Sequence, residues 1–337
     1  MWITVSHCQM TGGVEMKYDQ SRDLKQNGAA KKYEKKRIKM PDGRRNSRRI
    51  SKKSMTFYVV NDAILILLAV ICIYPVIHML SVSLSNQSAV AANQVNLLPV
   101  GFNFASYHMV AKRPAFWRAF RVSVIRVIVG VTINTVLTVL MAYPLSKSVN
   151  EFPARKYYVW VLLFAMIFDG GLVPNYLLVK DLGLFDSVWA LVLPGAVPIF
   201  NVILVMNFMK QLPATIEEAA EVDGASYFQR YTRIVLPLCK PSIATVVLFS
   251  FLGHWNAWFD GKIYNNNTVN YPLQTYLQAL LSQTDATNSS EAIENALTNV
   301  KTLQAAQLFL TMLPILAIYP FLQKYFTKGL TIGAVKG

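Results

Sequence analysis

Two apolar stretches of the sequence are interrupted by polar and aromatic residues that could bind a polar solute. The first contains Asp169-Gly170-Gly171 followed by Pro174, and the second is GHWNAWFDG at positions 253–261. Aromatic faces stack on the apolar faces of sugar rings, while Asn and Asp side chains bond hydroxyl groups, and ligand sites generally mix both kinds of surface. The candidate residues for a solute path are Asp169, Asn175, Tyr176, Trp255, Asn256, Trp258 and Asp260.

These residues also have structural interpretations. A carboxylate within a membrane is a functional candidate by default, but Asp169 can equally cap a helix beside the Gly-Gly break. Trp255 and Trp258 lie in the outer half of their apolar stretch. Tryptophans there commonly form an interfacial belt or pack between helices, and we prefer that interpretation to solute contact.

The sequence contains no pattern for catalysis. It lacks the G-x-x-x-x-G-K-[ST] phosphate loop, so we expect no ATP hydrolysis by this chain itself, and it also lacks G-x-S-x-G and H-E-x-x-H. Its 3 cysteines and 4 histidines are scattered, without the spacing of a metal site or of a disulfide framework. We therefore expect a chain that is not an enzyme and that has no catalytic residue, no metal and no cofactor of its own.

The elements that must position the candidate residues are membrane spans. The 337 residues are 53% hydrophobic, with a mean hydropathy of +0.33, and the apolar residues are gathered into runs long enough to cross a bilayer. The pattern predicts an all-α membrane protein with six transmembrane helices, and we expect Arg121 and Arg126 to extend to the interface from the outer end of the second. The predicted spans are Phe57–Ser81, Val122–Ala142, Tyr157–Val179, Val188–Phe208, Ser242–Ile263 and Ala306–Leu322.

The positive charge of the chain is concentrated at its N-terminus. Residues 1–56 hold 15 Lys and Arg and 5 Asp and Glu, which gives +10 of the net +15. A basic segment beside an apolar span is attracted to anionic headgroups, so we expect a membrane-surface tail and no nucleic-acid partner. The other basic residues also favour the same side of the membrane, which predicts N- and C-termini in the cytoplasm.

A polar segment between the fourth and fifth spans begins with a predicted short helix. Thr215 and Glu218 form a T-x-x-E capping box, which predicts a helix over Ile216–Asp223. Gly224 stands where a helix commonly ends with a residue at positive φ.

The same segment continues with a second short helix. Ser226 and Gln229 form an S-x-x-Q capping box, and we expect Pro237 to stop the helix that they start. The segment is therefore a predicted helix–turn–helix elbow. Ala219 and Ala220 give it a smooth patch that another backbone could approach closely.

The spacing in this elbow carries a family resemblance. Glu218-Ala219-Ala220, then Gly224 after three residues, then Ile234 and Leu236-Pro237, resembles the cytoplasmic EAA motif of permease subunits of binding-protein-dependent ABC importers. The alternatives are a capped loop that merely joins two helices and, for Glu218 alone, a capping residue.

Four further stretches resemble the carbohydrate-uptake class of these permeases. They are residues 168–201, the WNAWFD box, YPLQTYLQ at 271–278 and the ending KYFTKGLTIGAVKG. The closest likeness is to the subgroup that serves oligosaccharides and polysaccharide fragments, which is similar to the maltose-importer permease. The resemblance implies the type I ABC importer permease fold, with a cytoplasmic coupling helix, in the bacterial cytoplasmic membrane.

The resemblance also implies partners and a division of the chain. The partners are a second homologous permease, two ATPase subunits that bind ATP and Mg, an extracytoplasmic solute-binding protein and the sugar. The divisions are a basic cytoplasmic tail at 1–56, a permease domain at 57–326 with the coupling elbow at 214–237, and a cytoplasmic tail at 327–337. The implied ATPase-coupling residues are Glu218, Ala219, Ala220, Asp223, Gly224, Ala225, Phe228, Ile234, Leu236 and Pro237.

Two other classes of function stay open on the sequence alone. One is an ABC permease for another solute, such as a peptide or an amino acid; the tryptophan-rich fifth span favours sugars only weakly. The other is a channel or a scaffold that works without an ATPase, against which the elbow motif argues.

Overall fold

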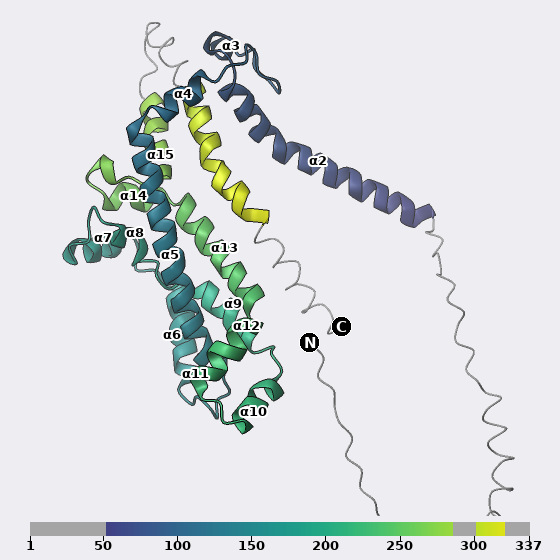
Figure 1. The fold of residues 1–337 in the computed structure, drawn as a ribbon, viewed down its shortest axis with the longest axis vertical. Helices are drawn as coiled ribbons and strands as arrows, with labels where there is room; N and C mark the ends of the chain where they lie inside the picture. Colours follow the sequence, from purple (N-terminus) through teal and green to yellow (C-terminus); the bar gives the residue numbers. More distant parts are fainter. Residues whose placement is uncertain (1–51, 286–300, 321–337) are drawn as a thin grey trace, which may run out of the picture. The chain divides into compact units, whose positions relative to one another are not determined.

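The computed structural model describes residues 52–285 and 301–320, and all regular structure within these ranges is helical (Figure 1). The chain separates into two compact units, Met1–Leu65 and Ile66–Gly337. The predictions for most of the basic tail and for the C-terminal tail concern residues outside the described ranges. Among the described residues, the first unit consists of the beginning of α2 (Lys52–Ser83).

Three described helices are long and apolar enough to cross a membrane. They are α2, from Phe57 onward, α5 (Pro114–Ser146) and the helix Lys301–Pro320. Three further pairs of helices qualify when each bent pair is taken as one span, which brings the total to as many as six in the described part of the chain. This upper limit equals the six spans predicted, although two of the bent pairs include a helical segment of the predicted elbow, Ala214–Val222 or Tyr227–Leu238.

The bends of these pairs fall at identifiable residues. The chain turns by 109° between α6 (Arg155–Ile167) and α7 (Leu172–Asp181), at the Gly-Gly break predicted for the third span. It turns by 72° between α9 (Ile199–Met209) and α10 (Ala214–Val222). The third bend, of 77°, separates the helical segment Tyr227–Leu238 from α13 (Lys240–Asn256).

Two spans that were predicted as continuous helices are each divided into two helices. The fourth is divided into α8 (Val188–Val192) and α9, because Pro194 and Pro198 lack the backbone N–H that would continue a helix. The fifth ends at Asn256 and resumes as α14 (Phe259–Tyr264).

The segments expected between the spans also contain helices. Between α2 and α5 lie α3 (Gln87–Ala91) and α4 (Ala105–Ala111). After α14 come a 3₁₀ turn, Thr268–Asn270, and α15 (Leu273–Asp285). The second and sixth spans are longer than predicted, since α5 begins at Pro114 and the last described helix begins at Lys301.

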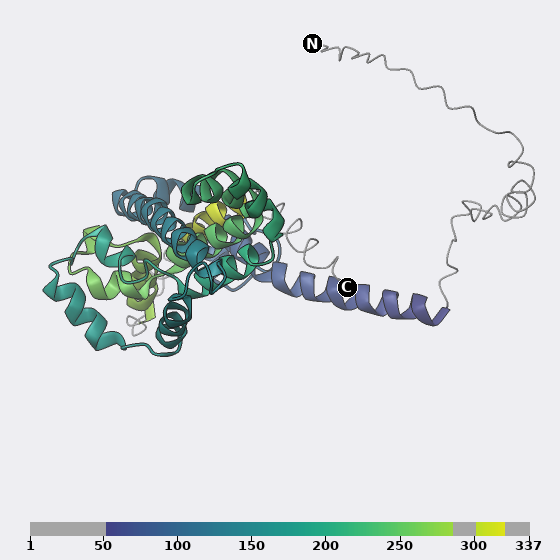
Figure 2. The same cartoon turned by 90° about the horizontal axis from the view of Figure 1, so that it is seen from below.

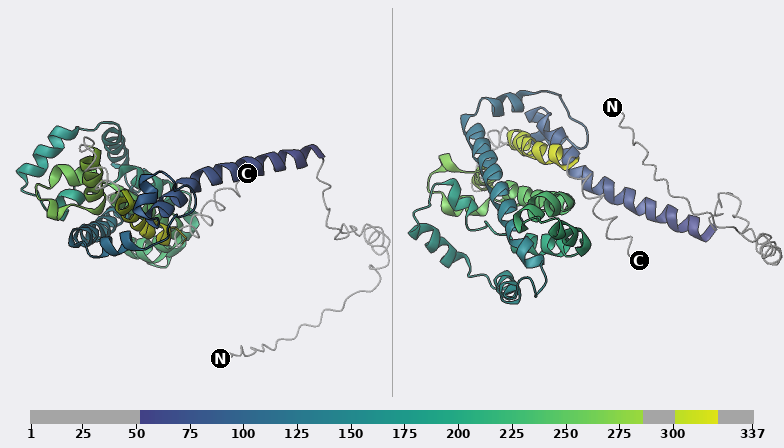
Figure 3. Two further views of the ribbon diagram at one scale, coloured as in Figure 1. Left: turned by 90° about the horizontal axis from the view of Figure 1, so that it is seen from above. Right: turned by 60° about the horizontal axis from the view of Figure 1, so that its bottom comes forward.

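Helix α5 takes part in two buried apolar clusters. Near its C-terminal end, Val139 and Ala142 pack with residues of α9 and α13 and with Tyr231. Near its N-terminal end, Phe116 and Ala119 pack with residues of α4, α13, α15 and the helix Lys301–Pro320, which is yellow in Figure 3. The elbow lies at the first of these ends, at the bottom of Figure 1, and so it faces the viewer in Figure 2.

Candidate functional site

The elbow begins two residues earlier than the sequence pattern indicates. Helix α10 starts at Ala214 with Pro213 at its N-cap, and no side chain caps it. The predicted capping box of Thr215 and Glu218 is therefore wrong, because Thr215 already lies inside the first turn and Glu218 is not three residues from the cap. Pro213 supplies a fixed φ, and its side chain has no acceptor with which to cap the helix.

The end of α10 forms as predicted. Gly224 has φ +78°, its N–H donates to the carbonyl of Glu221, and the N–H of Ala225 donates to the carbonyl of Ala220. These two bonds form a Schellman motif, which requires a residue in the left-handed conformation. The position is open, since a Cβ on Gly224 would have no heavy atom within 4 Å.

The second half of the elbow confirms one prediction and corrects another. The Ser226–Gln229 capping box is complete, with both reciprocal bonds present at the start of α11 (Tyr227–Gln229). The helix does not stop at Pro237. It passes through a π-helical segment, Arg230–Val235, and continues as α12 (Leu236–Leu238), with Pro237 in the first turn of α12, where a residue without an N–H is tolerated.

One acidic residue on α10 fastens the elbow to the end of α5. The carboxylate of Glu217 forms an ion pair with Lys147, the C-cap residue of α5. The hydroxyl of Tyr143 donates to the same oxygen of Glu217 at 3.3 Å, and the Lys147 ammonium lies 4.5 Å from the centre of the Tyr143 ring. Lys147 and Glu217 line a crevice of about 230 Å³.

A second acidic residue, one turn further along α10, joins the two halves of the elbow. Arg230 donates to the carboxylate of Glu221 at 2.7 Å, and its guanidinium lies 4.3 Å from the centre of the Tyr227 ring. Sequence reasoning missed Glu217 and Glu221, although their spacing of four residues places them on one face of a helix. The partners, Lys147 and Arg230, carry no sequence signal that links them to these positions.

Several other residues of the elbow are exposed, including Glu218, which lines the same crevice as Glu217 and Glu221. Glu218 is exposed and its carboxylate has no partner among the described residues. Val222 is 88% exposed and Phe228 is 72% exposed, although both are large and apolar. Of the other residues predicted for coupling, Ala219, Asp223, Gly224 and Pro237 are exposed, and Ala220, Ala225, Ile234 and Leu236 are half-buried.

The candidates in the third span surround its break. The Asp169 carboxylate accepts the N–H of Gly171 at 3.0 Å, and Gly171, with φ +86°, is the N-cap of α7. Asp169 thus closes the turn next to the helix without capping its first N–H groups. Asn175 is exposed, while Tyr176 is half-buried with its ring 5.2 Å from that of Phe185.

The two tryptophans of the WNAWFD box occupy different environments. Trp255 is only 2% exposed, and its Nε1 donates to the carbonyl of Thr311 on the helix Lys301–Pro320 at 3.1 Å. This position favours helix packing over solute contact. Trp258 is 39% exposed and Asn256 is exposed, both at the break between α13 and α14.

Asp260 is paired within the protein. It forms an ion pair with Arg126, whose side chain is 3% exposed, whereas that of Asp260 is 28% exposed. The expectation that Arg126 extends to the membrane interface is therefore wrong: the guanidinium is turned inward, where a carboxylate and backbone carbonyls satisfy it. Arg121 is exposed, as expected.

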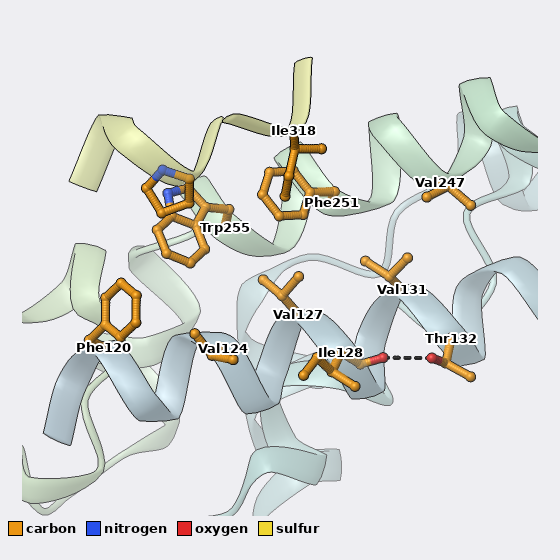
Figure 4. A pocket seen from close by; sticks show the side chains of 11 residues that line it. Phe120, Val124, Val127, Ile128, Val131, Thr132, Val247, Phe251, Trp255 and Ile318 are labelled. Atoms are coloured by element: carbon orange, nitrogen blue, oxygen red, sulfur yellow. Dashed lines mark hydrogen bonds between the residues drawn. The ribbon is translucent and has the colours of Figure 1, made fainter. Parts of the chain in front are cut away.

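A large apolar cavity lies between α5, α13 and the helix Lys301–Pro320. Its volume is about 610 Å³, and the aromatic rings of Phe120, Phe251 and Trp255 form part of its wall (Figure 4). The hydroxyl of Thr132 is directed to the carbonyl of Ile128 in its own helix. Such a lining suits hydrocarbon rather than a solute rich in hydroxyl groups.

Comparisons with known proteins agree with this arrangement. Residues 109–332 match the family described as "Binding-protein-dependent transport system inner membrane component". Protein LplC of Bacillus subtilis (strain 168) is 39% identical over 289 residues, which cover 85% of this chain and 97% of LplC. The polygalacturonan/rhamnogalacturonan transport system permease protein YtcP of the same organism is 33% identical over 287 residues, which cover 85% of this chain and 100% of YtcP.

A solved structure has the same fold. It is a chain of a bacterial ABC transporter involved in the import of the acidic polysaccharide alginate, with a TM-score of 0.74 and 31% sequence identity over 82% of this chain and 98% of that one. The family match spans well over half of the sequence. The chain therefore belongs to the family of binding-protein-dependent transport system inner membrane components and is an ABC importer permease of the type I fold.

Proposed function

We propose that this chain forms part of the translocation path of an ATP-driven importer for an oligosaccharide or a polysaccharide fragment. The similar proteins named for polygalacturonan/rhamnogalacturonan transport and for alginate import support a carbohydrate solute. The exposed Asn256 and Trp258 at the break in the fifth span supply an amide and an aromatic ring to such a path. Asp169 and Asn175 at the break in the third span supply further polar groups.

We infer that the elbow at 214–237 docks on an ATPase subunit. The observation that carries this inference is a contrast within the elbow: Glu217 and Glu221 are held by cations of this chain, while Val222 and Phe228 are large, apolar and exposed. An element that is held by ion pairs and also carries exposed apolar side chains suits rigid-body coupling to a partner. The remaining coupling residues follow from the motif and line the same element.

The assembly proposed around this chain has further members. A second homologous permease would complete the path, two ATPase subunits would bind ATP and Mg, and an extracytoplasmic solute-binding protein would deliver the sugar. Both termini and the elbow would then lie in the cytoplasm, a sidedness that the basic residues favour. The domain boundaries at residues 56 and 326 belong to the same proposal.

The experiment compares uptake by the parent chain and by an elbow variant. The complex is purified gently from native membranes, its solute-binding protein is identified, and uptake of labelled oligosaccharides is measured in reconstituted vesicles. Val222→Asp is expected to abolish uptake and to release the ATPase, because it places a charge in the apolar docking face. Val149→Asp is the matched control, since Val149 is exposed in the turn after α5, outside the elbow.

Three results would contradict the proposal. An ATPase that remains bound to the Val222→Asp chain at full uptake would exclude the elbow as its docking element. Uptake of peptides or amino acids in place of oligosaccharides would exclude the carbohydrate path. Recovery of the parent chain alone, without ATPase activity under several mild detergents, would favour a channel or a scaffold.

A further inference from the structure

One buried arginine connects three separate segments of the bundle. Arg126 lies in the uninterrupted helix α5, and both carboxylate oxygens of Asp260 accept from its guanidinium. Nη1 also donates to the carbonyl of Ala257 at 3.3 Å, and Nη2 donates to the carbonyl of Leu191 at 3.4 Å. Ala257 lies in the break of the fifth span, and Leu191 lies near the end of α8, so two interrupted spans are held against one continuous helix.

The carbonyl groups that Arg126 binds stand where helices are broken. Irregular backbone at membrane depth must find hydrogen-bond donors within the protein, because lipid supplies none. The planar guanidinium offers several donors in a fixed fork, so it can serve two carbonyls and a carboxylate at once. A lysine ammonium at the same position is a point charge without this geometry.

The backbone around the fifth-span break is held from a second side as well. The hydroxyl of Thr275 on α15 donates to the carbonyl of Trp258 at 2.7 Å. The N–H of Gly261 donates to the carboxylate of Asp260 at 2.8 Å, and a Cβ on Gly261 would lie 2.1 Å from the Thr275 hydroxyl. The segment between Asn256 and Gly261 is thus fixed between α5 and α15.

Ala257 is the residue between the two exposed side chains of this break, Asn256 and Trp258. We propose that Arg126 is a positioning residue for solute passage, which holds this break against α5 and α8 so that Asn256 and Trp258 face the path in a fixed geometry. The inference rests on the proposed function, in which this break borders the path. Arg126 itself is buried and acts through the two neighbouring side chains.

The test first measures how accessible the break is to a labelling reagent, and then measures uptake. A cysteine is introduced by Asn256→Cys, and its rate of labelling by a water-soluble maleimide is measured in the intact complex, with the parent chain correcting for Cys8, Cys72 and Cys239. Adding Arg126→Met is expected to change the labelling rate severalfold, because the carbonyl of Ala257 loses its donor. Adding Arg121→Met instead is the matched control, since Arg121 is an exposed arginine on the same helix.

Uptake of the labelled oligosaccharide is measured with Asn256 intact. Arg126→Met is expected to raise the half-saturating concentration by about tenfold or more, because small displacements of a positioned group have large effects on its function. Arg126→Lys should not restore the parent value, while Arg121→Met should match it. If Arg126→Met does not insert, Asp260→Asn replaces it, with a smaller change expected in the same direction in both measurements.

The outcomes separate this inference from the function on which it rests. An inserted Arg126→Met chain with an unchanged labelling rate, or with a reduced maximal rate but an unchanged half-saturating concentration, overturns the positioning role. Full rescue by Arg126→Lys also overturns it. If the parent chain takes up no oligosaccharide, the proposed function fails, whereas the labelling comparison, which needs no solute, still decides whether Arg126 holds the break.

Discussion

Lys147, at the end of α5, forms an ion pair with Glu217 on α10, and this pair joins a helix of 33 residues directly to the elbow. Both side chains are mostly buried, at 11% and 22% exposure. The pair is therefore less screened by solvent than an ordinary surface salt bridge. The pair thus connects the proposed ATPase-docking element to the end of α5 through side chains.

We expect Lys147→Met to lower uptake severalfold while the complex still assembles and hydrolyses ATP. The variant removes the tie between α5 and α10, which we expect to contribute about 1 kcal/mol, but leaves the exposed apolar residues of the elbow unchanged. Uptake and ATP hydrolysis are measured on the same vesicles. Lys156→Met, at an exposed lysine of α6, is the control and should behave as the parent. Partial recovery in the swapped pair Lys147→Glu with Glu217→Lys is expected, and a fully active Lys147→Met chain would contradict the connection.

The glycine at the end of α10 gives a second prediction. Gly224→Asp should abolish uptake while the chain still inserts, because it combines about 1 kcal/mol of backbone strain at positive φ with a charge in the docking face. Gly183→Asp is the matched control: Gly183 has φ +64° and open surroundings but lies outside the elbow. Membrane fractionation reports insertion, and vesicle uptake reports coupling. Equal losses of uptake in both variants would assign the effect to strain alone.

A close approach between α5 and α13 gives a prediction about stability. A Cβ on Gly130 would lie 2.4 Å from Nε2 of His254, so the imidazole occupies the space that a side chain would need. Gly130→Ala is expected to destabilise the purified chain by about 1–3 kcal/mol, as overpacking commonly does. Gly253→Ala, where a Cβ meets nothing within 4 Å, is the control. The measurement is the midpoint of thermal unfolding in detergent, and His254→Ala in the Gly130→Ala chain should recover part of the loss.

Asp186 gives a prediction about pH. The N–H of Asn267 donates to its carboxylate at 2.9 Å, and this bond is the main cause that lowers the pKa of Asp186 below its ordinary value. A depressed pKa in the folded state means that the stabilisation is fully present above the pKa of the unfolded chain and is lost as pH falls through the folded-state value. We therefore expect the stability advantage of the parent over Asp186→Asn to shrink as pH falls below about 4, the ordinary pKa of an aspartate.

The variant Asp186→Asn is a sharp comparison because asparagine keeps an acceptor oxygen and tolerates the φ of +59° at this position. The substitution removes the charge and changes one acceptor oxygen into an NH2 donor. Thermal unfolding midpoints of the two chains, measured above and below about pH 4, check the prediction. A difference that is constant with pH would show that the carboxylate charge contributes nothing to the turn.

The features that could be predicted from the sequence are local ones. The left-handed Gly224, the Ser226–Gln229 capping box and the break before Gly171 each depend on residues within a few positions of one another. The capping box of Thr215 failed for a local reason too, because Pro213 starts the helix earlier. Two ion pairs could not be predicted. Lys147, which holds the elbow, lies 70 residues from Glu217, and Arg126, which is turned inward, lies 134 residues from Asp260. Their pairing is decided by how whole helices pack.

Helix α5 carries Arg126 and ends at Ser146, next to Lys147. The same helix therefore contacts the break in the fifth span through Arg126 and is joined to the elbow through Lys147. Arg126 stands about 30 Å along the axis from Ser146, at about 1.5 Å per residue. A tilt of about 5° about that end would displace the guanidinium by roughly 2.5 Å, which is more than a hydrogen bond can lengthen. Any such tilt must therefore either carry α8 and the start of α14 along with α5 or break their hydrogen bonds to Arg126, so the contact at the break is expected to be either made or lost rather than stretched by degrees.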